Sequence, residues 1–99
     1  MVVTGMSQLT QLIEILLDHQ ARIDERDDAA IDLGNYDDES ALQALLIVAS
    51  DSLESEIVLA SCGESIGAIW RRRAIWSQEL LEKMTPAARR EIIAFTGRV

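Results

Sequence analysis

The sequence is poor in cysteine, proline, histidine and aromatic residues, and each shortage removes a class of structure. Of 99 residues, one is cysteine (Cys62), one is proline (Pro86) and one is histidine (His19). A single cysteine excludes an intrachain disulfide and a multi-cysteine zinc site, and it suits a reducing compartment, so we expect a cytoplasmic protein. Scarce proline among many Ala, Leu and Glu residues favours helix over sheet. With only four aromatic residues, the core must consist mostly of Leu, Ile, Val and Ala.

The N-terminal segment lacks the pattern of a leader or a membrane span. It has no basic region, and its apolar run LIEILLDH is interrupted by Glu14 and Asp18. This pattern predicts neither a signal peptide nor a transmembrane helix, so we expect no membrane partner. We expect one domain over residues 1–99, in which residues 1–6 form a disordered extension and Met6 is an alternative start to Met1.

Basic residues are scarce in the first two thirds of the chain. Fourteen acidic residues and two arginines precede Ser65, whereas three acidic and seven basic residues follow from there, and the net charge is −8. Such a field repels nucleic acid and anionic lipid and attracts basic partners. A merely solubilising surface is the alternative interpretation of the same charge.

Apolar residues recur at three- and four-residue spacing along most of the chain, which is typical of amphipathic helices. The pattern predicts an all-α fold of about six short helices, and no segment shows the alternation of a strand. We expect polar connections over 21–28 and 71–77, and left-handed C-terminal glycines at Gly34 and Gly97. The helices are predicted over the segments 7–19, 29–33, 40–51, 56–70, 78–84 and 86–96.

The string GESIG at residues 63–67 fits G-x-S-x-G, the nucleophile elbow of serine hydrolases. That elbow requires a strand-to-helix turn and a histidine later in the chain. Here the string lies inside a periodic helix, and His19 precedes it, so we expect no catalysis by Ser65. Gly63 and Gly67 are four residues apart and share one helix face, which predicts a close helix–helix contact with Ser65 near its edge. We expect Cys62, at a small position of the same helix, to be a core residue and not a nucleophile.

The residues AAIDLGNY (29–36) align with CGESIGAI (62–69), and Gly34 and Gly67 lie 33 residues apart. In addition, VLASCGESIGAI resembles the second helix of a HEAT-like repeat of the phycobilisome-lyase type, and DDESALQALLIVASD resembles its first helix. The resemblance is good over residues 37–70 and faint over 71–97. It implies a short HEAT-like helical-repeat solenoid, in which about three helix pairs must stack to form a core.

Two other chemistries have weak support in the sequence. The carboxylates of DERDDAAIDLGNYDDE do not have the spacing of an EF-hand, so we expect no metal site and no cofactor. Arg71, Arg72 and Arg73 lie between Trp70 and Trp76, a combination that could contact nucleic acid. In a chain of net charge −8, we instead expect these arginines to pair with the acidic half and the tryptophans to pack, without direct nucleic-acid binding.

The function hypothesis that remains is an acidic protein-binding surface on a domain that is not an enzyme. Small acidic bacterial proteins of this architecture resemble toxin inhibitors, which implies an immunity protein that blocks a cognate basic, nuclease-type toxin as a monomer within a heterodimer. The alternative is a HEAT-like scaffold or adaptor module in a larger assembly. If equivalent turns project from one edge of the solenoid, that edge carries the partner-binding residues, with Tyr36 as an aromatic contact. The predicted set is Asp24, Asp27, Asp28, Asp32, Tyr36, Asp37, Asp38, Glu39, Asp51 and Glu54.

Overall fold

The computed structural model describes residues 7–97, which form six α-helices and no strand. This confirms the all-α prediction for that part of the chain, while residues 1–6 and the extension predicted there lie outside it. The helices are α1 (Gln8–Leu17), α2 (Ile23–Leu33), α3 (Glu39–Ala49), α4 (Glu56–Arg73), α5 (Gln78–Lys83) and α6 (Pro86–Thr96).

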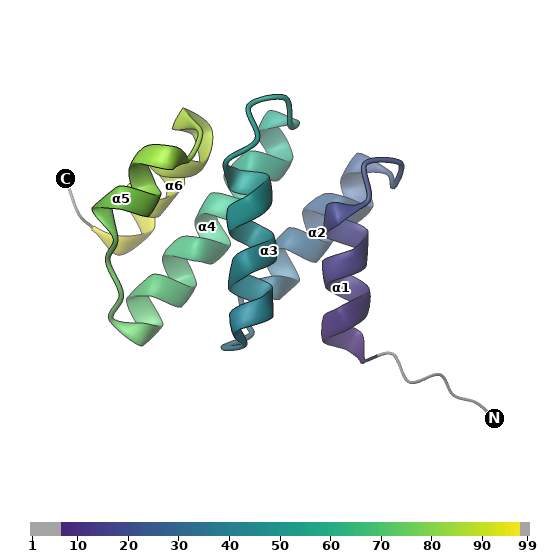
Figure 1. The fold of residues 1–99 in the computed structure, drawn as a ribbon, viewed down its shortest axis with the longest axis horizontal. Coiled ribbons are helices and arrows are strands. Elements are labelled where there is room, and N and C mark those ends of the chain that lie inside the picture. The colour runs from purple at the N-terminus through teal and green to yellow at the C-terminus, as the bar shows by residue number, and fades with distance from the viewer. Residues whose placement is uncertain (1–6, 98–99) are drawn as a thin grey trace.

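The helices lie in two layers, and each odd-numbered helix is followed by an even-numbered helix behind it (Figure 1). In this view α1, α3 and α5 form the front layer, and α2, α4 and α6 form the rear layer. Helix α4 contacts α2, α3 and α6, and its contact with α6 is the most extensive between any two helices. The longest helix therefore organises the fold, with a neighbour on either side of it in the rear layer.

Polar side chains cap the N-termini of four of the six helices that the structure describes. Ser7, Asp38, Ser77 and Thr85 are N-cap residues whose side chains accept a hydrogen bond from a backbone amide of the first turn, and Pro86 occupies the first turn of α6. These contacts satisfy amide groups that have no partner within the helix. The starts of these four helices are therefore encoded locally, which is why they can be predicted from the sequence.

The core is aliphatic, as predicted, except for one large aromatic side chain. Leu16, Leu33, Leu45, Ile66 and Trp70 are fully buried, and they come from four of the six helices. Thr85 connects the end of the chain to this core, because its backbone amide and its hydroxyl both donate to the carbonyl of Ala49, at 2.9 and 3.0 Å. The turn between α5 and α6 is thereby fixed to the C-terminus of α3.

Two predicted connections were wrong because parts of them are helical. Helix α2 begins at Ile23, six residues before the predicted start, and Arg26 in its second turn is buried. Asp24 and Glu25 occupy its first turn, where carboxylates stabilise the positive end of the helix dipole. Helix α4 continues through Arg73 and ends at Ala74, which adopts a left-handed conformation (φ 55°). Three arginines in its last turn complement the negative end of the helix dipole.

The glycines of GESIG do mark a helix–helix contact, as predicted. A Cβ atom built on Gly63 would lie 2.3 Å from the carbonyl oxygen of Ala88 in α6, and one built on Gly67 would lie 2.9 Å from Cβ of Phe95. Gly34 has a corresponding role toward α4, since its Cβ would lie 2.6 Å from Oγ of Ser65. The predicted left-handed conformation is correct for Gly97 (φ 75°) and wrong for Gly34 (φ −64°). Position 34 requires glycine because a side chain there would collide with Ser65.

Ser65 does not lie at the edge of this contact but in the interface between α4 and α2. Its side chain is buried, and its hydroxyl donates to the carbonyl of Ala30 at 2.6 Å. At the end of α2 the amide of Gly34 donates to the carbonyl of Ile31, one residue after Ala30. The hydroxyl of Ser65 therefore gives the Ala30 carbonyl, in the last turn of α2, a hydrogen-bond donor from another helix. The expectation of a peripheral serine was therefore wrong.

We expect Ser65→Ala to lower the free energy of unfolding by about 1–2 kcal/mol, because a buried carbonyl loses its hydroxyl donor. Urea unfolding followed by circular dichroism measures this change. Ser61→Ala is a useful comparison, because its hydroxyl on the same helix donates to a half-buried carboxylate that can also reach water. A Ser65→Ala variant as stable as the wild type would contradict the role of this hydrogen bond.

Candidate partner-binding surface

The ten residues predicted to bind a partner do not lie on one edge of the molecule. Four lie on α2, four lie in or next to the connection between α2 and α3, and Asp51 and Glu54 lie in the loop between α3 and α4. The two connections are at opposite ends of α3, as Figure 1 shows, and an 11-residue helix is about 16 Å long. The expectation of a single acidic edge was therefore wrong, because these residues form three separate groups.

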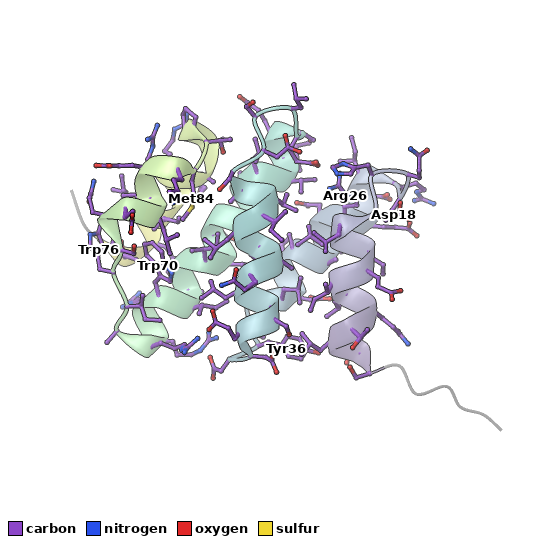
Figure 2. All side chains as sticks on the ribbon, in the orientation of Figure 1. Asp18, Arg26, Tyr36, Trp70, Trp76 and Met84 are labelled. Atoms are coloured by element: carbon purple, nitrogen blue, oxygen red, sulfur yellow. The ribbon has the colours of Figure 1, made fainter. Side chains whose placement is uncertain are left out.

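Glu54 belongs to a buried ion pair. Its carboxylate oxygen Oε2 lies 2.5 Å from Nη1 of Arg26, and the two side chains are 3% and 5% exposed. The same guanidinium donates from Nε and Nη2 to the carbonyl of Leu16, at 3.0 and 2.8 Å. Arg26 thus connects the end of α1 to the loop between α3 and α4, close to the first interhelical turn (Figure 2). Glu54 is a structural residue and is not available to a partner.

His19 and Asp51 lie beside this ion pair. Nδ1 of His19 is 3.6 Å from Oε1 of Glu54, and possible ligand atoms of His19, Asp51 and Glu54 all lie within 4.8 Å of one another. Both oxygens of Glu54 already interact with Arg26. His19 is solvent-exposed, and its neighbour is the loop after α3, a contact that the sequence did not reveal.

The acidic residues before α3 are largely neutralised by the arginines at the end of α4. Arg72 donates to Oδ1 of Asp37 from Nε and Nη2, at 2.9 and 2.7 Å, and Arg73 lies 3.8 Å from Glu39. Asp38 caps α3 and accepts from the hydroxyl and the amide of Ser40, and these hydrogen bonds lower the pKa of its carboxyl group.

The aromatic side chains Tyr36, Trp70 and Trp76 lie near these arginines or at the same end of α4. Tyr36 is half-buried, and Arg72 donates to its backbone carbonyl at 3.3 Å. Trp70 and Trp76 pack edge to face with ring centroids 5.6 Å apart. The prediction that the tryptophans pack is confirmed, and the prediction that the arginines pair with acidic residues is confirmed for Arg72 and Arg73, whereas Arg71 forms no ion pair within residues 7–97.

Of the four α2 carboxylates in the predicted set, two interact with other side chains and two are unpaired among the described residues. Asp24 pairs with Arg22 at 2.5 Å, which lowers the pKa of its carboxyl group, and Asp27 accepts from the hydroxyl of Ser61 in α4. Asp28 and Asp32 are exposed and form no ion pair within residues 7–97. They lie four residues apart, one helical turn, and so give α2 an outward-facing pair of negative charges.

An apolar groove crosses the rear layer next to this acidic helix. Its volume is ≈ 200 Å³, and residues of α2, α4 and α6 and of the turn after α2 line it: Ile31, Gly34, Asn35, Glu64, Ser65, Ala68 and Phe95. Ile31 is 44% exposed and Phe95 is 38% exposed, so two large apolar side chains face solvent at this groove. Sequence reasoning missed the groove because its walls come from helices more than 60 residues apart.

The two candidate nucleophiles have surroundings that do not suit nucleophilic catalysis. The hydroxyl of Ser65 already donates to a helix carbonyl inside the α2–α4 interface. Cys62 is fully buried, and burial together with the charge of Glu54 raises the pKa of its thiol to about 12. A thiol with this pKa stays protonated at neutral pH, and the thiolate is the reactive form. The prediction that Cys62 packs in the core is confirmed.

The described residues include no helix that is both long and apolar enough to cross a bilayer. In comparisons with models of known protein families, with curated proteins and with solved structures, nothing matches this chain.

Proposed function

We propose that this chain is a binding protein without catalytic activity whose acidic surface recognises a basic protein. Its most concrete form is an immunity protein that binds and blocks a cognate nuclease-type toxin. The observation that carries the proposal is the pair Asp28 and Asp32, two exposed carboxylates without a cationic partner within residues 7–97, on the helix that borders the apolar groove. Apolar contact area beside unpaired charge of one sign is what a complementary partner surface requires.

The charge of the chain supports a basic partner in preference to other ligands. With a net charge of −8, the molecule accelerates encounter with a cationic surface and repels phosphate groups. A nuclease binds the nucleic-acid backbone through a cationic cleft. An acidic protein seated on such a cleft would exclude the substrate both sterically and electrostatically.

The arrangement of the helices supports the HEAT-like interpretation of the fold, which we retain as part of the proposal. Gly34 and Gly67, which align in the internal repeat, occupy related positions: Gly34 contacts α4, and Gly67 contacts α6. Leu33 and Ile66, which precede them, are both fully buried. Repeat domains of this kind present extended surfaces for binding proteins.

The proposal predicts that neutralising the acidic pair slows association with a basic partner. We expect Asp28→Asn/Asp32→Asn to lower the association rate with a nuclease-type toxin domain encoded beside this gene by roughly tenfold at low salt, because electrostatic steering depends on these charges. Stopped-flow fluorescence measures the rate. Glu79→Gln/Glu82→Gln is the matched control, because it removes two exposed carboxylates from α5. Equal losses in both variants would show that only total charge matters.

Salt dependence separates this proposal from a scaffold or adaptor module. Association steered by charge falls sharply between low and physiological salt, whereas association through an apolar surface alone does not. An association rate that is unchanged over this range, or no association with basic toxin domains at low salt, would contradict the proposed function.

A further inference from the structure

The floor of the groove is the outward face of α4. Ile57, Ser61, Glu64 and Ala68 recur at three- and four-residue spacing on this helix, and each is at least partly exposed. The strip lies between α2 and α6, the two neighbours of α4 in the rear layer (Figure 1). Ser65 and Ala68 are the small α4 residues that line the groove, and Ile31 of α2 and Phe95 of α6 line it from the two neighbouring helices.

One unpaired negative charge lines this groove. Glu64 is exposed and takes part in no ion pair within residues 7–97. Arg72 reaches one lining residue of the groove, since it donates to the carbonyl of Gly34 at 3.1 Å, but it is already paired with Asp37. The groove therefore combines two apolar walls with one carboxylate that has no counter-charge among residues 7–97.

We propose that this groove receives a single arginine or lysine side chain of the basic partner. The methylene stem lies between Ile31 and Phe95 over Ala68, and the cationic head meets the carboxylate of Glu64. This inference rests on the proposed function. It adds one specific contact, which we call the anchor: the insertion of a cationic side chain of the partner into the groove.

A cationic side chain fits these walls better than an apolar one. Arginine and lysine bury an apolar stem while the charged head stays at the polar rim. An inserted leucine would fill the groove, but it would desolvate the carboxylate of Glu64 without giving it a partner. Arginine is also enriched among the residues that dominate binding energy at protein interfaces.

The test uses the ¹⁵N-labelled chain and the peptide acetyl-Gly-Arg-Gly-amide, titrated to millimolar concentration at constant ionic strength. We expect saturable shifts of the backbone amides of Gly34, Asn35, Ala68 and Phe95. The same peptide with citrulline, which keeps the stem and shape of arginine but lacks its charge, should bind roughly fivefold more weakly, the effect of one partly exposed ion pair. In Glu64→Gln the two peptides should bind equally, whereas Glu79→Gln should behave as the wild type.

Three results would overturn the anchor: no saturable shift at the groove, equal binding of the arginine and citrulline peptides to the wild type, or tighter binding of a leucine peptide. Two further results distinguish failure of the anchor from failure of the proposed function. If Asp28→Asn/Asp32→Asn slows association with a toxin domain while Glu64→Gln and Ala68→Met leave its dissociation rate unchanged, the partner is basic but its anchor lies elsewhere. If no basic toxin domain associates at low salt, the proposed function fails whatever the peptides show.

Discussion

Gly63→Ala should destabilise the protein by about 3 kcal/mol, although a single methyl group is added. The new Cβ would lie 2.3 Å from the carbonyl oxygen of Ala88 and 2.8 Å from its Cα. Both are backbone atoms of α6, so no side-chain rotation relieves the clash, and the two helices must separate. Overpacking of this kind costs about 1–3 kcal/mol, and more where the surroundings cannot yield. For a small domain that is a large share of the total stability.

Helix propensity alone would make Gly63→Ala stabilising, so a measured loss of stability cannot come from helix propensity. In an exposed helix, replacing glycine by alanine stabilises by about 1 kcal/mol. A net loss for Gly63→Ala therefore reports the contact with α6 and not the helix itself. Urea unfolding gives the free energy, and amide hydrogen exchange should show that protection is lost first in α6.

Gly67→Ala is the graded comparison for the same contact. Its Cβ would meet Cβ of Phe95 at 2.9 Å and Cα of Ile92 at 3.3 Å, so smaller movements relieve the clash. We expect a loss smaller than that of Gly63→Ala. If Gly63→Ala were as stable as the wild type, or more stable, the close approach of α4 and α6 would be wrong.

The features that could be predicted from the sequence are those that depend on local chemistry. Ser77 and Thr85 cap helices because their hydroxyls accept hydrogen bonds from amides three residues later, and such spacing is visible in the chain. Gly63 and Gly67 share a helix face because of the 3.6-residue period, so their close contact with another helix could be predicted. The identity of that helix could not, because α6 lies more than 20 residues further on.

The features that were missed depend on contacts between distant residues. The segment ARIDERDD has the composition of a polar connection, but the buried contact of Arg26 with Glu54, 28 residues away, makes most of it the start of α2. The angle of Ser65 around α4 relative to the two glycines predicts a position at the edge of the contact. Its hydrogen-bond partner, the carbonyl of Ala30, is 35 residues away in the sequence. The same limit applies to the partner-binding residues, since charge alone did not reveal which carboxylates the chain's own arginines already hold.

Glu54→Gln should destabilise the protein by about 3 kcal/mol, even though the two side chains have nearly the same shape. The change leaves the guanidinium of Arg26 buried without a counter-charge, and removing one partner of a buried ion pair costs about 3–5 kcal/mol. The hydrogen bonds from Arg26 to the carbonyl of Leu16 remain, which places the expected loss at the low end of this range. Thermal or urea unfolding at neutral pH measures it.

The ion pair between Arg22 and Asp24 is the natural control, because it has the same 2.5 Å separation but lies on the surface. Its side chains are 74% and 64% exposed, whereas those of Arg26 and Glu54 are 5% and 3% exposed. We expect Asp24→Asn to cost at most about 1 kcal/mol, because the exposed ion pair is screened by water and the carboxylate contributes little more as a first-turn charge of α2. Equal effects of Asp24→Asn and Glu54→Gln would contradict the buried position of Arg26.

A double replacement then separates the cost of an unpaired charge from the contribution of the pair. In Arg26→Met/Glu54→Met the cavity is filled by apolar side chains and no buried charge remains, so we expect this variant to be more stable than Glu54→Gln. It would still lose the two hydrogen bonds to the Leu16 carbonyl, which hold the end of α1. Hydrogen exchange should therefore show faster opening of α1 in the double variant even where the overall stability recovers. That combination would identify Arg26 as the residue that fixes α1 to the rest of the domain.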